Sequence, residues 1–154
     1  MCKLILFYGR ILSLLMEVLM NIKRFFVFTT AVFFAIFCYE FLIHSILFSS
    51  LYHQTAHLWR SMEDGGMYYG FMLVSQLAFS ASMYFMYAKL AESKVLVSAC
   101  HLGCYVGLVL GSVQIGTYMY MPIPLILTCG WVAASVGRGI VAGFVIDILT
   151  KKTA

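Results

Sequence analysis

Four long apolar runs constrain the fold of this chain more than any other feature of its sequence. The runs cover residues 25–49, 67–88, 95–116 and 123–149. A helix needs roughly 20 apolar residues to cross a hydrocarbon core about 30 Å thick, and each run is that long. Inside lipid a helix satisfies its own backbone hydrogen bonds. We therefore predict an all-α integral membrane protein, built as a bundle of four transmembrane helices.

The composition agrees with a chain that presents little surface to water. Of its 154 residues, 63% are hydrophobic and only 10% are charged, with a mean hydropathy of +0.96. A soluble domain has about a quarter charged residues, so we expect residues 20–154 to form a single transmembrane domain. The net charge of +4 does not indicate nucleic-acid binding, because the basic residues lie beside the apolar runs and not in a patch.

The basic residues also predict an orientation. Those that flank the runs are Lys23, Arg24, Lys89, Lys94, Lys151 and Lys152. The loops that follow the first and third runs contain only one basic residue, Arg60. By the positive-inside rule, both termini and the middle loop are cytoplasmic. Asp147, near the inner edge of the fourth run, is expected to pair with Lys151 on the next turn.

Two further segments are expected to lie on the membrane surface as amphipathic helices. Between the first two runs, one helical face is apolar and includes Trp59, while His53 and His57 lie on the opposite face. Residues 1–19 have a similar pattern and form either a cytoplasmic interfacial helix or a non-native extension. The second alternative arises because MNIKRFF, which begins at Met20, already opens a good signal-anchor.

Small residues at every fourth position predict where the helices pack closely. They form one ridge in the third run and another in the fourth: Gly103, Gly107 and Gly111, then Ser135, Gly139 and Gly143. Such spacing allows the backbone of another helix to approach. We expect these two glycine ridges to face each other or a partner subunit.

Four polar residues fall inside the apolar runs at similar predicted depths. Glu40 and His44 lie four residues apart in the first run, Gln76 lies in the second and Arg138 in the fourth. An ionisable side chain at mid-membrane costs about 2.5–3.5 kcal/mol on insertion scales, so it normally faces protein or water. We predict one intramembrane polar cluster. It is either a structural ion pair that fixes helix register or a proton- or ligand-binding site.

The sequence predicts no cofactor and no metal site. A bis-histidine haem needs two histidines at one depth, whereas His44 and His101 are expected near opposite faces of the membrane. His53 and His57 are weak candidates for metal ligands, because their spacing places both on one helical face. The same spacing also describes the wet face of an interfacial helix.

Two segments resemble the signature motifs of a known family. The segment EFLIHSILFSSLYHQTAHLWR (residues 40–60) contains EFLxH and LYxxxxxLWR, and YMYMPIP (residues 118–124) contains YxxxPxP. Both resemble motifs of an uncharacterised family of small bacterial four-span membrane proteins. The resemblance implies a four-span fold in the bacterial cytoplasmic (inner) membrane. It implies no activity and no substrate.

Three hypotheses of function follow from these features. The leading one is a non-catalytic accessory or assembly component that binds other membrane subunits or a second copy of itself within the bilayer. It is favoured by the glycine ridges, by the 16% aromatic content and by the absence of any catalytic motif. The alternative is a small oligomeric proton-coupled transporter or channel that uses Glu40 and His44. The second alternative is a membrane enzyme with an outer-face histidine site.

Overall fold

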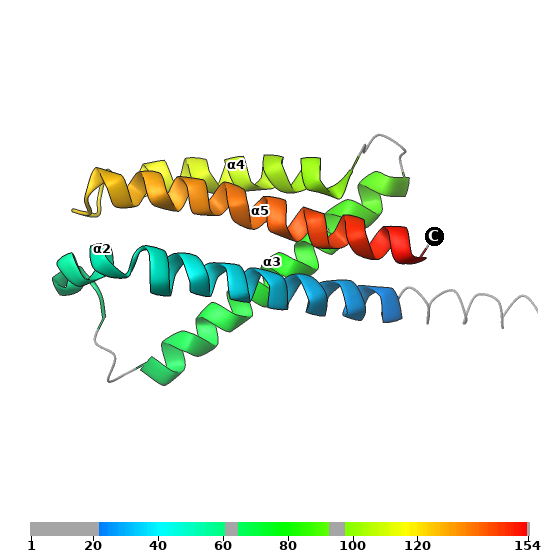
Figure 1. Ribbon diagram of the computed structural model, residues 1–154, viewed down its shortest axis with the longest axis horizontal. Helices are drawn as coiled ribbons and strands as arrows, with labels where there is room; N and C mark the ends of the chain where they lie inside the picture. Colours follow the sequence, from blue (N-terminus) through cyan, green and yellow to red (C-terminus); the bar gives the residue numbers. More distant parts are fainter. Residues whose placement is uncertain (1–21, 61–64, 93–97, 154) are drawn as a thin grey trace, which may run out of the picture.

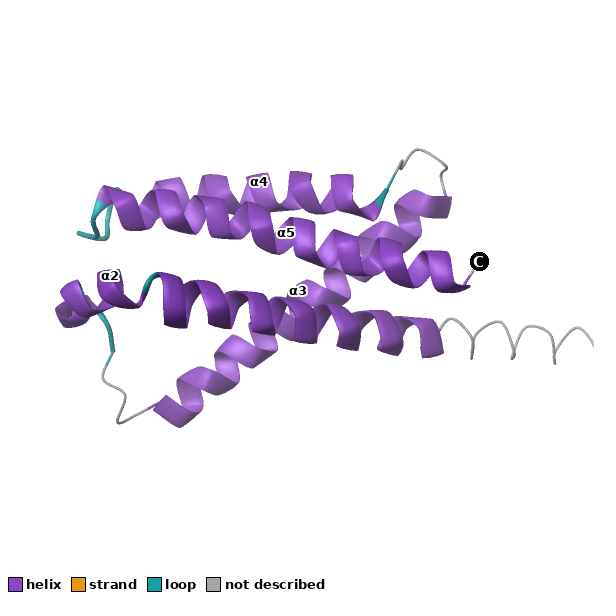
Figure 2. Cartoon of the chain, viewed as in Figure 1, coloured by secondary structure: helices purple, strands orange, loops and turns teal. Residues whose placement is uncertain are grey.

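The computed structural model describes residues 22–60, 65–92 and 98–153, and all regular structure within these ranges is helical (Figure 1, Figure 2). The first helix covers residues 22–40. The elements after it are the π-helix η1 (Phe41–Leu47), α2 (Ser49–Gln54), the 3-10 helix η2 (Ala56–Leu58), α3 (Gly65–Glu92), α4 (Ala99–Thr117) and α5 (Leu125–Thr153).

Four helices are long and apolar enough to cross a membrane. They are Ile22–Leu47, Met67–Ala91, Ala99–Thr117 and Leu125–Lys152. The prediction of an all-α protein with four membrane spans is confirmed, and each observed span overlaps a predicted run. The expectations for residues 1–19 and for a start at Met20 lie outside the described residues.

The four spans run alternately up and down, so the bundle has two distinct ends (Figure 1). At one end the first helix begins, α3 ends, α4 begins and α5 ends. We call it the basic end, because it contains Lys23, Arg24, Lys151 and Lys152. At the opposite end lie α2, η2 and the turn at 118–124. We call it the aromatic end, since Tyr52, Trp59, Tyr118, Tyr120 and Trp131 belong to it.

The helices α4 and α5 form the most extensive contact, and glycine makes that contact possible. The two glycine ridges lie against each other. A Cβ atom on Gly139 would collide with the backbone carbonyl of Gly103, and one on Gly143 with that of Ala99. A Cβ on Gly107 would lie 2.7 Å from the Cα atom of Val136. Backbone therefore packs on backbone along the ridge, which only residues without a side chain allow.

A carboxylate fastens the same two helices at the basic end. Asp147 of α5 accepts backbone hydrogen bonds from Ala99 (2.8 Å) and Cys100 (3.0 Å), at the N-terminus of α4. These N–H groups have no partner within their own helix, and a negative charge also suits the helix dipole there. The expected partner of Asp147 was Lys151. The carboxylate instead caps a neighbouring helix that lies 48 residues away along the chain.

The apolar core occupies the basic half of the bundle. All four spans contribute buried side chains to it: Phe28, Val32, Ile36, Met83, Ala99, Leu102, Ala142 and Ile146. Phe28 also packs against the ring of Tyr84 of α3, at 5.2 Å between centroids. Ile36 is the last residue of the first helix in this cluster, so Glu40 lies one turn beyond the core, toward the aromatic end. In that direction α3 crosses the other spans at an angle (Figure 1).

Replacing Gly139 by alanine tests the backbone contact. We expect the free energy of unfolding in mixed micelles to fall by about 1–3 kcal/mol, because the methyl group must separate two backbones. Gly70→Ala is the matched control, since a Cβ at Gly70 has nothing within 4 Å. That variant should be neutral or stabilised by up to about 1 kcal/mol from helix propensity. Equal effects of the two substitutions would contradict the packing argument.

Candidate functional site

The predicted polar cluster lies where the first span changes from α-helix to π-helix. Glu40 directly precedes η1, and His44 lies within it. The backbone N–H of Phe48 donates to the carbonyl of Ile43, five residues earlier, at 2.9 Å. Such π-helical turns are rare in proteins, and those that occur often lie at functional sites. The segment FLIHSIL contains neither glycine nor proline, so its sequence carries no sign of this change.

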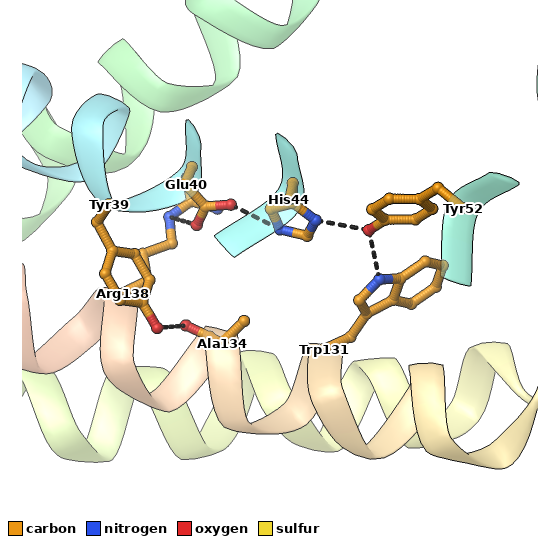
Figure 3. Close-up of polar contacts among 7 residues, drawn as sticks. All are labelled: Tyr39, Glu40, His44, Tyr52, Trp131, Ala134 and Arg138. Carbon is orange, nitrogen blue, oxygen red and sulfur yellow. Dashed lines mark hydrogen bonds and ion pairs between the residues drawn. The ribbon is translucent and has the colours of Figure 1, made fainter. Parts of the chain in front are cut away.

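Both carboxylate oxygens of Glu40 have ionisable neighbours (Figure 3). Nε2 of His44 lies 2.9 Å from Oε2, and Nε of Arg138 lies 3.6 Å from Oε1. The Arg138 contact is an ion pair whose separation exceeds that of a hydrogen bond. The guanidinium also lies over the ring of Phe79, 4.3 Å from its centroid. The three polar side chains are only 17–35% exposed. Within a membrane, each therefore offers the others polar contacts in place of water.

The cluster continues from His44 through two aromatic side chains. Nδ1 of His44 lies 2.5 Å from the hydroxyl of Tyr52, which accepts a hydrogen bond from Nε1 of Trp131 at 2.8 Å (Figure 3). An indole nitrogen only donates, so the Tyr52 hydroxyl is the acceptor of the Trp131 hydrogen bond. On the other side of the histidine, Nε2 faces the carboxylate of Glu40. The two ring nitrogens of His44 therefore link the Tyr52 hydroxyl to that carboxylate.

Close contacts between the first span and α5 hold these side chains in place. The hydroxyl of Tyr39 donates to the carbonyl of Ala134 at 3.2 Å, and Gly137 leaves room for that hydroxyl. Nearer the aromatic end, the ring of Phe48 packs on Gly130, where a Cβ would lie 2.6 Å from the ring. Two glycines of α5 thus accommodate the first span, on positions separate from the glycine ridge that faces α4.

Two cavities border the cluster. One of about 260 Å³ lies toward the aromatic end and is also lined by Tyr52, Gln114 and Trp131. The other, of about 650 Å³, lies between the first span and the first half of α3. Glu40, His44 and Arg138 line both cavities. The three ionisable side chains therefore form a wall that the two spaces share.

Gln76 lies on the larger cavity without bonding to the rest of the cluster. It is only 5% exposed, and its Oε1 has no hydrogen-bond partner among the described residues. The four predicted members of the cluster thus line one cavity. Glu40 contacts both His44 and Arg138, whereas Gln76 lines the same cavity separately.

The two histidines that are candidate metal ligands lie on separate short helices at the aromatic end. The predicted amphipathic helix is divided, because α2 ends at Gln54 and η2 begins at Ala56. His53 and His57 therefore lie on different short helices, and both are exposed. Thr55, between them, is buried and accepts a hydrogen bond from Trp59 at 3.0 Å. Within residues 22–60, 65–92 and 98–153, no group of three His, Cys, Asp or Glu side chains is placed to hold a metal ion.

Tyr52 and Trp131 belong to the cluster, although the sequence did not indicate it. Tyr52 lies in the segment for which the sequence predicts an amphipathic surface helix. Eight residues of continuous α-helix would place it roughly 12 Å beyond His44 along the axis. The break at Phe48 turns the chain so that the two side chains meet. His44 belongs to the EFLxH motif and Tyr52 to the LYxxxxxLWR motif. These neighbouring motifs are the one sequence signal that links the two residues.

Comparison with known proteins finds no relative: no family model, no curated protein and no solved structure matches the chain. The family that the two motifs resemble is therefore not identified by comparison. Length and composition of the helices identify a small multi-pass membrane protein with four candidate spans.

The hydroxyl of Tyr52 gives the cluster a measurable pH dependence. Burial raises the pKa of Tyr52 above its usual 10.0, and the charge of Glu40 raises it further, against an opposing effect of the Trp131 hydrogen bond. A raised pKa in the folded state stabilises the fold below the unfolded value, and this contribution is lost as pH rises through the folded value. Above pH 10.0, the free energy of unfolding should fall more steeply for the wild type than for Tyr52→Phe.

Tyr120→Phe serves as the control for this titration, because Tyr120 is 71% exposed in the turn after α4. Its unfolding curve should follow the wild type at every pH. Parallel curves for the wild type and Tyr52→Phe would show that the Tyr52 hydroxyl is not coupled to the fold.

Proposed function

We propose that this protein is a small proton-coupled transport protein, in which Glu40 is the proton-binding group and His44 delivers the proton. The observation that carries the proposal is the chain of contacts from Trp131 through Tyr52 and His44 to Glu40, set between two cavities. A purely structural ion pair needs neither this chain of contacts nor the cavities.

The smaller cavity supports access of protons to the cluster. Its volume of about 260 Å³ has room for several waters, at roughly 30 Å³ each in the liquid. Polar side chains of Gln114, Ser135 and Tyr52 line it, so such waters have hydrogen-bond partners. A proton from this water would reach Glu40 directly or through His44, whose two ring nitrogens already bridge Tyr52 and the carboxylate.

Charge balance supplies the coupling. With Glu40 ionised, the carboxylate attracts both Arg138 and the Nε2–H group of His44. Protonation of Glu40 removes that attraction and leaves the guanidinium with a net charge in a partly buried place. The arrangement around Arg138 then favours a second conformation, which is how proton binding would drive a conformational change.

The direction of transport follows from the positive-inside rule. We assign the basic end to the cytoplasm and the aromatic end to the outer side of a bacterial cytoplasmic membrane. Both cavities border Glu40, beyond the apolar core, so this conformation would be open toward the outer side. The core of the basic half would have to rearrange before a proton could leave inward. Four spans enclose little volume, and a homo-oligomer would supply the remaining walls.

Assembly with other membrane subunits is the second candidate, and α3 favours it. Residues 71–75 of α3 are all exposed, whereas a helix in a bundle normally buries one face against its neighbours. A partner helix of another subunit would cover part of this surface. The protein would then act as a non-catalytic component of a larger complex.

Replacing Glu40 by glutamine tests the transport proposal. The amide preserves the shape of the side chain but cannot take up a proton. We expect potential-driven proton uptake by reconstituted vesicles to fall to the level of protein-free vesicles. Glu92→Gln is the matched control, because Glu92 is the last residue of α3 and lies at the basic end. Uptake that persists in Glu40→Gln would remove Glu40 from the path and contradict the proposal.

Native mass spectrometry of the protein, released gently from its own membranes, distinguishes the second candidate. A stoichiometric complex with a different subunit would support the accessory role. A monomer or homo-oligomer would contradict it. The variant Val74→Glu, on the exposed face of α3, should dissociate a heteromeric complex, because it buries a charge at the interface.

A further inference from the structure

The larger cavity has the character of a binding site for an amphiphile. Its volume of about 650 Å³ lies in the usual range of ligand sites, about 300–1,000 Å³. Apolar side chains of the first span and of α3 make most of its wall: Phe37, Phe41, Met72 and Leu73. The polar part of its wall includes Glu40, Gln76 and Arg138. The cavity thus offers apolar side chains to a hydrocarbon tail and polar side chains to a head group.

Two buried atoms at this polar region lack hydrogen-bond partners within the described residues. Oε1 of Gln76 is an acceptor without a donor, on a side chain that is only 5% exposed. Nε of Arg138 is a donor without an acceptor, since its contact with Glu40 is too long for a hydrogen bond. Buried polar groups are normally paired, so the head group that fits here both donates and accepts.

The charges of the wall select against an ionised head. The carboxylate of Glu40 already faces the guanidinium of Arg138, so these two charges offset each other at the wall. An anionic or cationic head would add an uncompensated charge at mid-membrane, which is unfavourable.

From these three observations we propose that the larger cavity binds a neutral amphiphile with a hydroxyl-bearing head. The hydroxyl donates to Oε1 of Gln76, and an oxygen of the head accepts from Arg138. The tail lies along Phe37, Phe41 and Leu73. The inference rests on the proposed function in one respect: the amphiphile is the molecule whose binding the proton on Glu40 controls.

Photolabelling tests the proposal with a defined probe. The probe is a monoacylglycerol with a diazirine in its acyl chain, added to the full-length protein in detergent micelles. We expect labels on Phe37, Phe41, Met72 or Leu73, identified by mass spectrometry of peptides. Leu73→Trp should reduce labelling because the indole occupies part of the cavity. Leu108→Trp is the control, since Leu108 is 53% exposed on α4 and does not line the cavity.

Competition by unlabelled oleoyl compounds tests the chemistry of the head. Monoolein should compete about tenfold better than methyl oleate, which accepts hydrogen bonds but donates none; tenfold corresponds to about 1.4 kcal/mol. In Gln76→Leu the probe should still label the cavity, but the two esters should compete equally. Oleate or oleylamine that competes better than monoolein would overturn the neutral head. Labels spread evenly over the lipid-facing surface would overturn the site.

These outcomes separate the inference from the proposed function. Proton uptake that depends on Glu40, without cavity labelling, would overturn the inference and leave the transport proposal intact. Cavity labelling with the predicted head preference, without proton uptake, would support the binding site and remove the transport proposal.

Discussion

The backbone contact between α4 and α5 is the constraint on which the rest of this structure depends. Because Gly103, Gly139 and Gly143 leave no side chain between the two helices, α5 is held at a distance that only glycine permits. The Asp147 carboxylate then fastens the same pair at the basic end. Lipid tails are as apolar as the side chains they replace, so close packing and polar fastening must hold such a pair together.

A rigid α5 matters because its remaining surface positions the polar cluster. Arg138 and Trp131 lie at the two ends of the chain of contacts, and Gly130 and Gly137 accommodate the first span that carries Glu40 and His44. A displacement of α5 by the width of a methyl group would lengthen the contacts at both ends together. The glycine ridge thus holds α5 in place, and α5 in turn positions the polar cluster.

The sequence was sufficient for those features that repeat with the helical period. Apolar runs of sufficient length predict spans, and small residues at every fourth position predict a close helix pair, because each pattern depends on local geometry alone. The depths of Glu40, Gln76 and Arg138 followed from counting residues along straight helices. Their side chains do line one cavity.

Features that depend on a local departure from the helix, or on a contact distant in sequence, could not be predicted. The π-helix at Phe41–Leu47 and the break at Phe48 arise in a segment with neither glycine nor proline. Without that break, Tyr52 would lie beyond reach of His44. The role of Asp147 was missed for another reason. A lysine one turn away is the obvious partner in sequence, but unpaired backbone N–H groups of a neighbouring helix compete for the carboxylate. Ala99 is fully buried, so its N–H group depends on an acceptor within the protein, whereas the exposed Lys151 can be hydrated.

The same reasoning explains why the polar cluster is placed beside cavities and not within the core. The apolar core ends at Ile36, one turn before Glu40, so the cluster occupies the half of the bundle where α3 diverges. A fully enclosed cluster would need every donor and acceptor satisfied by protein, and Gln76 and Arg138 each retain an unpaired atom. A structural ion pair would be more stable with those atoms paired or absent. Their position at the wall of a cavity of about 650 Å³ supports the proposed binding site, because a few placed polar groups fix the orientation of a ligand in such sites.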